Sequence, residues 1–108
     1  MDKLLPQREK EITIKDIDRE FTFKVKLFSI EEGTRFFCEY FSVMKFTQET
    51  LESILTLASL KQIIEGKETY IDFDLQQAYA IFKSPIAIYN LADRILNFQI
   101  EVFTNSKS

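Results

Sequence analysis

A chain of 108 residues with a net charge of −3, no histidine and one cysteine is long enough for one domain with its own hydrophobic core. The absence of histidine excludes Ser-His-Asp and Cys-His nucleophile systems, and the lone Cys38 excludes an internal disulfide. Two glycines exclude a phosphate-binding glycine loop, and the scattered lysines and arginines form no basic stripe for nucleic acid.

The two ends of the chain are polar. Residues 1–9 are charged and contain Pro6, which predicts a flexible arm, and residues 105–108 predict a polar tail. Between them, residues 10–104 are expected to form a single α+β domain. No apolar run approaches about 18 residues, and the start of the chain lacks the pattern of a signal peptide. These features indicate a cytoplasmic protein.

An antiparallel β-hairpin is predicted over about residues 11–27. Ile12 and Ile14 alternate with polar residues in its first strand. In its second strand the apolar positions are Phe21, Phe23, Val25 and Leu27. Residues 16–19 form a polar turn without glycine, so a tight two-residue turn is not expected. Because a lone hairpin is only marginally stable, its apolar face is expected to pack on helices or on another subunit.

The rest of the chain is expected to be mainly helical, with about four helices, the first over residues 30–45. Ser29 and Glu32 match a capping box at its start. Its apolar residues lie within an arc of about 160° of the helix surface. They are Ile30, Phe36, Phe37, Tyr40, Phe41, Val43 and Met44. Gly33 lies within this arc, which predicts the close approach of another backbone. The aromatic cluster at residues 36–41 favours a core, with a ligand pocket as the alternative.

A second helix is predicted over residues 48–65. Thr47 is its expected N-cap, and Gly66 is its expected left-handed stop. Its apolar residues fall on two faces about 130° apart on ideal helical geometry. One face holds Leu51, Ile54, Leu55 and Ala58, and the other holds Leu57, Leu60 and Ile64. Such a helix either lies between two layers or offers its second face to a partner.

The last part of the chain predicts two further helices. Residues 70–74 alternate and suit either a short strand or a loop, and Asp74 is the expected cap of a helix over residues 75–83. Ser84 and Pro85 predict the start of the final helix, over residues 85–103. Its second half also alternates like a strand, but its polar residues share one arc of about 100°, which favours a helix.

The wide apolar arc of the last helix and the second face of residues 48–65 exceed what one small core needs. Surplus apolar surface typically marks an interaction site. The alternative is that the hairpin and the short helix cover it. The residues expected to bind a partner are Leu57, Leu60, Ile64, Leu91, Phe98 and Val102.

Few residues suggest chemistry, and no cofactor or metal is expected. Asp16/Asp18 and Asp72/Asp74 are Asp-x-Asp pairs that could ligate a divalent cation, but neither lies in a calcium-loop pattern. Turn and cap carboxylates are the favoured interpretation of both pairs. Cys38 lies near glutamates on its helix, which disfavours a reactive thiolate.

Several segments resemble the tail assembly chaperones of long-tailed bacteriophages. The strand opening Arg-Glu-Phe at residues 19–21 is followed by a Phe-Ser step into an acidic helix start at residues 28–32. Residues 82–85 (Phe-Lys-Ser-Pro) and 89–91 (Tyr-Asn-Leu) are similar to the late helices of that family. The resemblance covers about residues 10–103 and is one of layout, without a diagnostic motif.

This resemblance implies a non-enzymatic protein that is absent from the finished virion. Such chaperones act in the host cytoplasm, bind the long helical tape-measure protein, keep it soluble and recruit tail-tube subunits. Many are made beside a frameshifted, longer form, and a homo-oligomer is expected. The family has no catalytic set, so the resemblance assigns no site residue.

Two other functions are compatible with the sequence. A small acidic chain without catalytic residues could inhibit a host defence nuclease by occupying its basic groove. A metal-dependent enzyme using Asp72 and Asp74 is the third and least favoured hypothesis.

Overall fold

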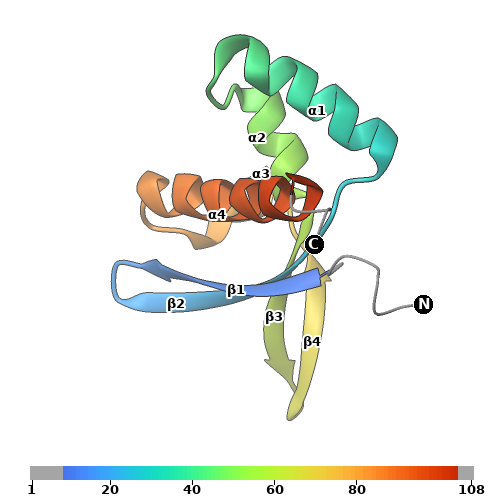
Figure 1. Cartoon of the computed structure of the whole chain (residues 1–108). Coiled ribbons are helices and arrows are strands. Elements are labelled where there is room, and N and C mark those ends of the chain that lie inside the picture. Colours follow the sequence, from blue (N-terminus) through green and yellow to red (C-terminus); the bar gives the residue numbers. More distant parts are fainter. Residues whose placement is uncertain (1–8, 105–108) are drawn as a thin grey trace, which may run out of the picture.

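The computed structural model describes residues 9–104, in which four strands form one antiparallel sheet in chain order (Figure 1). The strands are β1 Glu9–Asp16, β2 Arg19–Lys26, β3 Ala58–Ile64 and β4 Lys67–Asp72. The helices are α1 Ile30–Val43, α2 Gln48–Leu55, α3 Leu75–Ile81 and α4 Pro85–Thr104. The predicted α+β class is confirmed. Of the expected arm and tail, only Glu9 is described, and it begins β1; residues 1–8 and 105–108 lie outside the described residues.

The predicted hairpin is present, but its turn is tighter than expected. Ile12 and Ile14 of β1 and Phe23 and Val25 of β2 are buried, as their alternation predicts. Asp16 pairs with Arg19, so only Ile17 and Asp18 form the turn. Ile17 has a φ of 59°, which is unfavourable for a β-branched residue. The prediction of a looser turn was wrong because contacts with residues far away in the sequence hold Asp16 and Arg19, on either side of the turn.

The predicted helix over residues 48–65 is wrong in its second half. α2 ends at Leu55, and residues 58–64 form β3, which pairs with β2 through three residues, Ala58–Leu60. The backbone N–H of Lys26 also donates to the Leu57 carbonyl, 3.0 Å away. The open edge of β2 therefore provides partners that end the helix. Residues 70–74, which suited either a strand or a loop, lie largely in β4.

Gly66 ends a strand rather than a helix. Ile64 pairs with Lys67, so Glu65 and Gly66 form a two-residue turn between β3 and β4. Both residues have positive φ, 52° for Glu65 and 80° for Gly66. This is the conformation that glycine adopts without steric cost, and it suits the tight turn of a hairpin.

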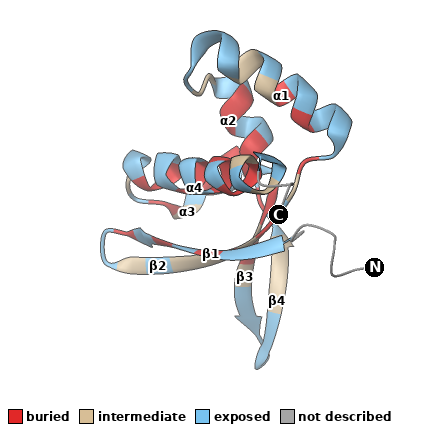
Figure 2. Cartoon of the chain, viewed as in Figure 1, coloured by how far each residue is buried: buried red, intermediate tan, exposed pale blue. Residues whose placement is uncertain are grey.

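α4 packs along one face of the sheet, and its buried residues form the centre of the hydrophobic core (Figures 1 and 2). Its predicted helical form is confirmed, and the Ser84 hydroxyl accepts from the Ile86 amide at 3.2 Å near its start. The fully buried Gln99 side chain accepts from the Phe28 amide and donates to the Lys26 carbonyl, both at 2.9 Å. These two bonds fix α4 to the connection between β2 and α1.

The shorter helices have the N-cap residues that the sequence predicts, but the capping box predicted at Ser29 and Glu32 makes only one of its two hydrogen bonds. The Ser29 hydroxyl accepts from the Glu32 amide at 3.1 Å, and the Thr47 hydroxyl accepts from the Thr50 amide at 3.1 Å. The Asp74 carboxylate accepts from the Gln77 amide at 2.8 Å. α1 and α2 lie on the far side of α4 from the β1–β2 hairpin (Figure 1). No helix within residues 9–104 combines the length and the apolar character needed to span a membrane.

Candidate functional site

α1 is amphipathic, but the other residues between 9 and 104 leave much of its apolar side uncovered. Only Gly33 and Phe36 of this helix are buried (Figure 2). Phe37 and Tyr40 are partly buried, and the large apolar residues exposed on or next to the helix are Ile30, Phe41, Val43 and Met44. A helix with this sequence pattern normally buries such a face. The exposed part is therefore surface in excess of what the core uses.

Stacked aromatic rings attach α1 to the body of the protein. The Phe36 ring centre lies 5.0 Å from that of Phe28 and 5.7 Å from that of Tyr40. Tyr40 in turn contacts Phe46, with ring centres 5.2 Å apart. Phe37 also belongs to this attachment, since its ring centre lies 5.1 Å from that of Phe36 and 6.3 Å from that of Phe28, and the exposed Phe41 stacks on Phe37 with ring centres 5.3 Å apart. The aromatic cluster therefore divides between a core part and an exposed part.

Gly33 allows α1 to approach the segment that precedes it. A Cβ atom at this position would lie 3.1 Å from the Cβ of Phe28, closer than ordinary packing allows. The sequence predicted close approach of another backbone at Gly33. The neighbour is instead the Phe28 side chain.

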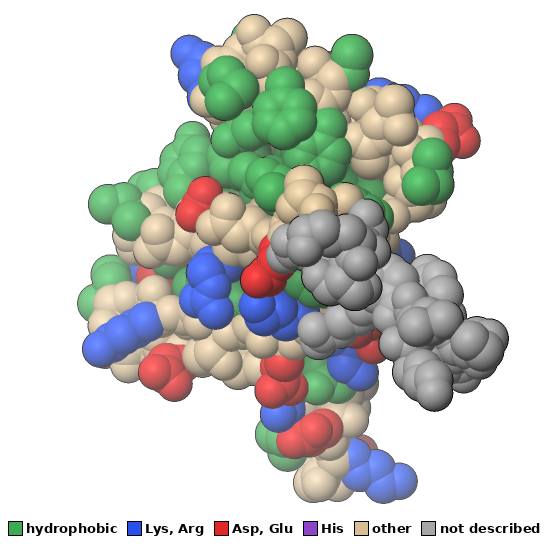
Figure 3. All heavy atoms as spheres, in the orientation of Figure 1, with side chains coloured by type: hydrophobic (Ala, Val, Ile, Leu, Met, Phe, Trp, Pro, Cys, Tyr) green, Lys and Arg blue, Asp and Glu red, His purple; other side chains and the backbone are tan. Residues whose placement is uncertain are grey.

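An apolar groove of about 390 Å³ lies between α1 and the C-terminal end of α4. Its lining includes no charged side chain and consists of Ser29, Ile30, Gly33, Thr34, Phe37, Phe41, Ile100, Phe103 and Thr104. Figure 3 shows hydrophobic side chains gathered over α1, α2 and α4 on this side of the molecule. We call this feature the α1–α4 groove. Nothing in its lining can act as a general base or metal ligand, so its chemistry is that of apolar contact.

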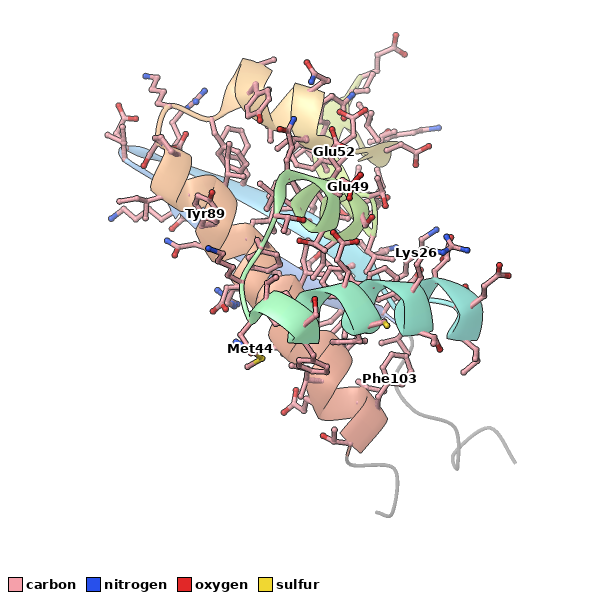
Figure 4. The ribbon with its side chains drawn as sticks, turned by 90° about the horizontal axis from the view of Figure 1, so that it is seen from above. Lys26, Met44, Glu49, Glu52, Tyr89 and Phe103 are labelled. Atoms are coloured by element: carbon pink, nitrogen blue, oxygen red, sulfur yellow. The ribbon has the colours of Figure 1, made fainter. Side chains whose placement is uncertain are left out.

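The opposite side of α1 is polar. A second hollow of about 300 Å³ lies between α1 and α2, and charged residues of its lining include Lys26, Glu32, Arg35 and Glu39. Figure 4 shows Phe103 on one side of α1, with Lys26, Glu49 and Glu52 on the other side. α1 thus separates an apolar groove from a charged one.

The residues that the sequence predicted to bind a partner do not line the α1–α4 groove. Leu57, Leu60, Leu91 and Phe98 are at most 7% exposed and belong to the core, which corrects that prediction. Leu57 and Leu60 are buried because residues 57–60 lie at or in β3. Leu91 and Phe98 are buried because the wide apolar face of α4 packs on the sheet. Val102 is partly buried beside the core, and Ile64 is exposed on β3.

Most of the large apolar residues of the groove belong to helix faces that the sequence predicted to be apolar. Ile30, Phe37 and Phe41 lie in the apolar arc of the first predicted helix, and Phe103 lies in that of the last one. The missing information was which part of each arc the fold leaves open. That depends on the angle between α1 and α4, which no local pattern specifies.

One aspartate of each candidate metal-binding pair has a structural role. Asp16 accepts from the backbone N–H groups of Lys83 and Ser84 at 2.9 and 3.1 Å, and Asp74 caps α3. Within residues 9–104, no three His, Cys, Asp or Glu side chains come together in a way that could hold a metal ion. Cys38 is exposed on α1.

Comparison with known proteins gives no relative. No protein-family model, no curated protein and no solved structure matches this chain.

Proposed function

We infer that this chain is a non-enzymatic binding protein whose α1–α4 groove holds the apolar face of a partner's helix. The observation that carries this proposal is the groove itself, about 390 Å³ in volume and free of charged lining residues. Docking of an amphipathic helix into a hydrophobic groove is a recurrent mode of recognition, in which a few large side chains serve as anchors. Phe37, Phe41 and Phe103 provide the aromatic contact surface that such anchors need.

The net charge of the α1–α2 region favours a partner that carries basic residues, although none of this charge lines the groove. Residues 30–56, which include α1 and α2, contain five acidic and two basic side chains, a net charge of −3. The whole chain has the same net charge, so the rest of the sequence is balanced. Glu32 and Glu39 line the α1–α2 hollow, and Glu49 and Glu52 lie on the other side of α1 from Phe103 (Figure 4). This charge can therefore speed the approach of a basic partner, but it does not line the groove.

A tail assembly chaperone is the specific function that agrees with this geometry and with the resemblance of the sequence. The partner would be the helical tape-measure protein, which needs its apolar surface masked until tail-tube subunits assemble around it. The protein would then act in the host cytoplasm as a self-associating adaptor. A groove between two helices, without catalytic groups, supports such a role.

The test is capture of partners from a lysate of the native host, read by mass spectrometry. The wild-type chain is expected to retain a long, repetitive, helix-rich protein or a tail-tube subunit. Phe41→Asp and Phe103→Asp are expected to lose it, because each places a charge in the groove.

Ile86→Asp is the matched control for these variants. Ile86 is an apolar residue of α4, 68% exposed, and it lies outside the groove, whereas Phe41 is 51% exposed. The control is expected to capture the same partner as the wild-type chain. Equal capture by Phe41→Asp, Phe103→Asp and Ile86→Asp would show that the groove is not the docking site.

Inhibition of a host defence nuclease is a second candidate, and the acidic character of residues 30–56 is the observation that favours it. In that case the polar side of α1, with Glu32 and Glu39, would face the basic groove of the enzyme. Binding would weaken steeply as salt is added, because exposed charge pairs are screened. Capture of a nuclease that survives Phe41→Asp but is lost in high salt would support this candidate over the chaperone.

A further inference from the structure

The two hairpins of the sheet separate beyond Leu60, and this leaves part of β3 without a neighbour on one side. β2 pairs with β3 only where Phe23–Val25 lie opposite Ala58–Leu60, whereas β4 follows β3 as far as Ile64. Figure 1 shows the far ends of β3 and β4 projecting away from β1 and β2. Along Lys61–Ile64, no strand of the described residues lies on the side of β3 opposite β4. We call this stretch the open edge of β3.

The hydrogen-bonding groups of this edge follow from the register of the hairpin. Ile64 and Lys67 flank a two-residue turn, so they exchange both of their backbone hydrogen bonds. The pattern alternates in an antiparallel pair, so Gln62 also bonds to β4. The N–H and C=O groups of Lys61 and Ile63 therefore point away from β4, towards the open side. Such unpaired groups are a template for another strand.

The side chains of the open edge are unusually apolar for a surface strand. Ile63 is 64% exposed and Ile64 is 45% exposed. Lys61 lies on the same face as Ile63, where its ammonium group pairs with Glu68 at 3.1 Å. Neither proline nor a bulge interrupts the stretch. Of the devices that protect sheet edges, which include proline, bulges and charged side chains, this stretch has only Lys61, whose charge is paired with Glu68.

We propose that the open edge of β3 pairs with the same edge of a second copy of this chain, forming a two-fold antiparallel dimer. With the symmetry axis at Ile63, that residue lies opposite its own copy, and Gln62 lies opposite Ile64. Lys61 then lies opposite Glu65 of the second copy, twice in the dimer. The edge is thus complementary to itself in charge, through Lys61 and Glu65, and in apolar contact at Ile63.

Neighbouring registers fit less well. An axis at Gln62 would require Ser59 and Leu60 to pair with the second copy, but β2 already occupies both through Lys24 and Phe23. An axis at Ile64 would leave the outward-facing groups of Lys61 without partners. The register centred on Ile63 uses the whole open stretch and stops at the point where β2 begins to pair.

The proposed dimer does not depend on the proposed function of the α1–α4 groove. In Figure 1 the open edge and α1 lie at opposite ends of the molecule. A dimer built through β3 would therefore leave both grooves free, one at each end. Two docking sites on one assembly would bind a long or repetitive partner with increased avidity.

Sedimentation equilibrium of the full chain at several concentrations tests the proposal. The wild-type chain is expected to show a reversible monomer–dimer equilibrium. Ile63→Lys brings two like charges together at the axis, and Glu65→Lys places a positive charge opposite Lys61 in place of a negative one. Each is expected to raise the dissociation constant at least about tenfold.

Ile17→Lys is the matched control, because Ile17 is also exposed in a hairpin, at 63%, but lies in the β1–β2 turn. It is expected to leave the dissociation constant unchanged. Amide hydrogen exchange adds a second readout. Protection of Lys61 and Ile63 should rise with protein concentration, whereas Gln62 and Ile64 should be protected throughout. A monomer at concentrations up to about 1 mM, or a dimer insensitive to both Ile63→Lys and Glu65→Lys, would overturn the proposal.

Discussion

Asp16 holds the tip of the first hairpin against the connection between α3 and α4. It is fully buried, and its carboxylate accepts from the backbone N–H groups of Lys83 and Ser84. Arg19 pairs with it at 3.3 Å and also donates to the Ile81 carbonyl. This one side chain therefore satisfies two backbone donors more than 60 residues away. It also explains how a turn with a β-branched residue at positive φ is kept in place.

Asp16→Ala is expected to lower the free energy of unfolding by about 2–4 kcal/mol. The substitution leaves two backbone N–H groups without their acceptor and Arg19 without its ion-pair partner. Urea unfolding measures the loss. Asp18→Ala is the control, since Asp18 is exposed in the same turn and its loss should stay within about 0.5 kcal/mol. Similar values for the two variants would show that the buried carboxylate does not anchor the turn.

At the scale of the elements, the boundary between α2 and β3 could not be predicted from local sequence patterns. Residues 48–65 contain apolar residues at helical spacing, yet Ala58 and Leu60 also alternate as a strand requires. The choice is made by β2, whose free edge bonds to residues 57–60. The β1–β2 hairpin, α1 and α4 were predictable because their periodicity allows one answer or because a cap marks their start. β3 was not, because its partner lies more than 30 residues earlier.

The open face of the sheet has a polar network that joins its strands. Lys61 of β3 pairs with Glu68 of β4 at 3.1 Å and with Glu11 of β1 at 3.8 Å. The Tyr70 hydroxyl donates to Glu11 at 3.2 Å, and the Lys24 ammonium of β2 lies 4.2 Å from the centre of the Tyr70 ring. The hydrogen bond to Glu68 is the main cause that raises the pKa of Lys61. Desolvation, followed by the bond to Glu11, raises the pKa of Tyr70.

Stability is expected to fall in alkaline solution as this network loses protons. Lys61 makes its full contribution to the free energy of unfolding below its ordinary pKa of 10.5. This contribution is lost as pH rises through the higher pKa that Lys61 has in the folded chain. Tyr70 acts in the same direction, because the unfolded chain releases the phenol proton from pH 10.0 upwards while the folded chain retains it. Thermal unfolding on both sides of pH 10.0 measures this fall. Tyr70→Phe and Lys61→Met should each make the fall shallower, and unchanged profiles in both would contradict the assignment.

At the scale of the whole molecule, α4 lies between the sheet and the α1–α2 pair, and the core is concentrated around it (Figure 2). Among the helices, α1 buries the smallest share of its residues, two of 14. The sequence predicted the amphipathic face of α1 but not how much of it would be covered. Exposed apolar surface therefore exists on α1 and at the end of α4, whereas four of the six residues first assigned to it are buried in the core.

Two phenylalanines of α1 allow the core part of this helix to be separated from its exposed part. Phe36 is 4% exposed and packs on Phe28, whereas Phe41 is 51% exposed beside the α1–α4 groove. Phe36→Ala is expected to lower the free energy of unfolding by about 3–5 kcal/mol. Phe41→Ala is expected to cost less than about 1 kcal/mol. Urea unfolding of both variants measures the difference. If the two losses are equal, Phe41 belongs to the core, and the groove loses the exposed aromatic surface on which helix docking depends.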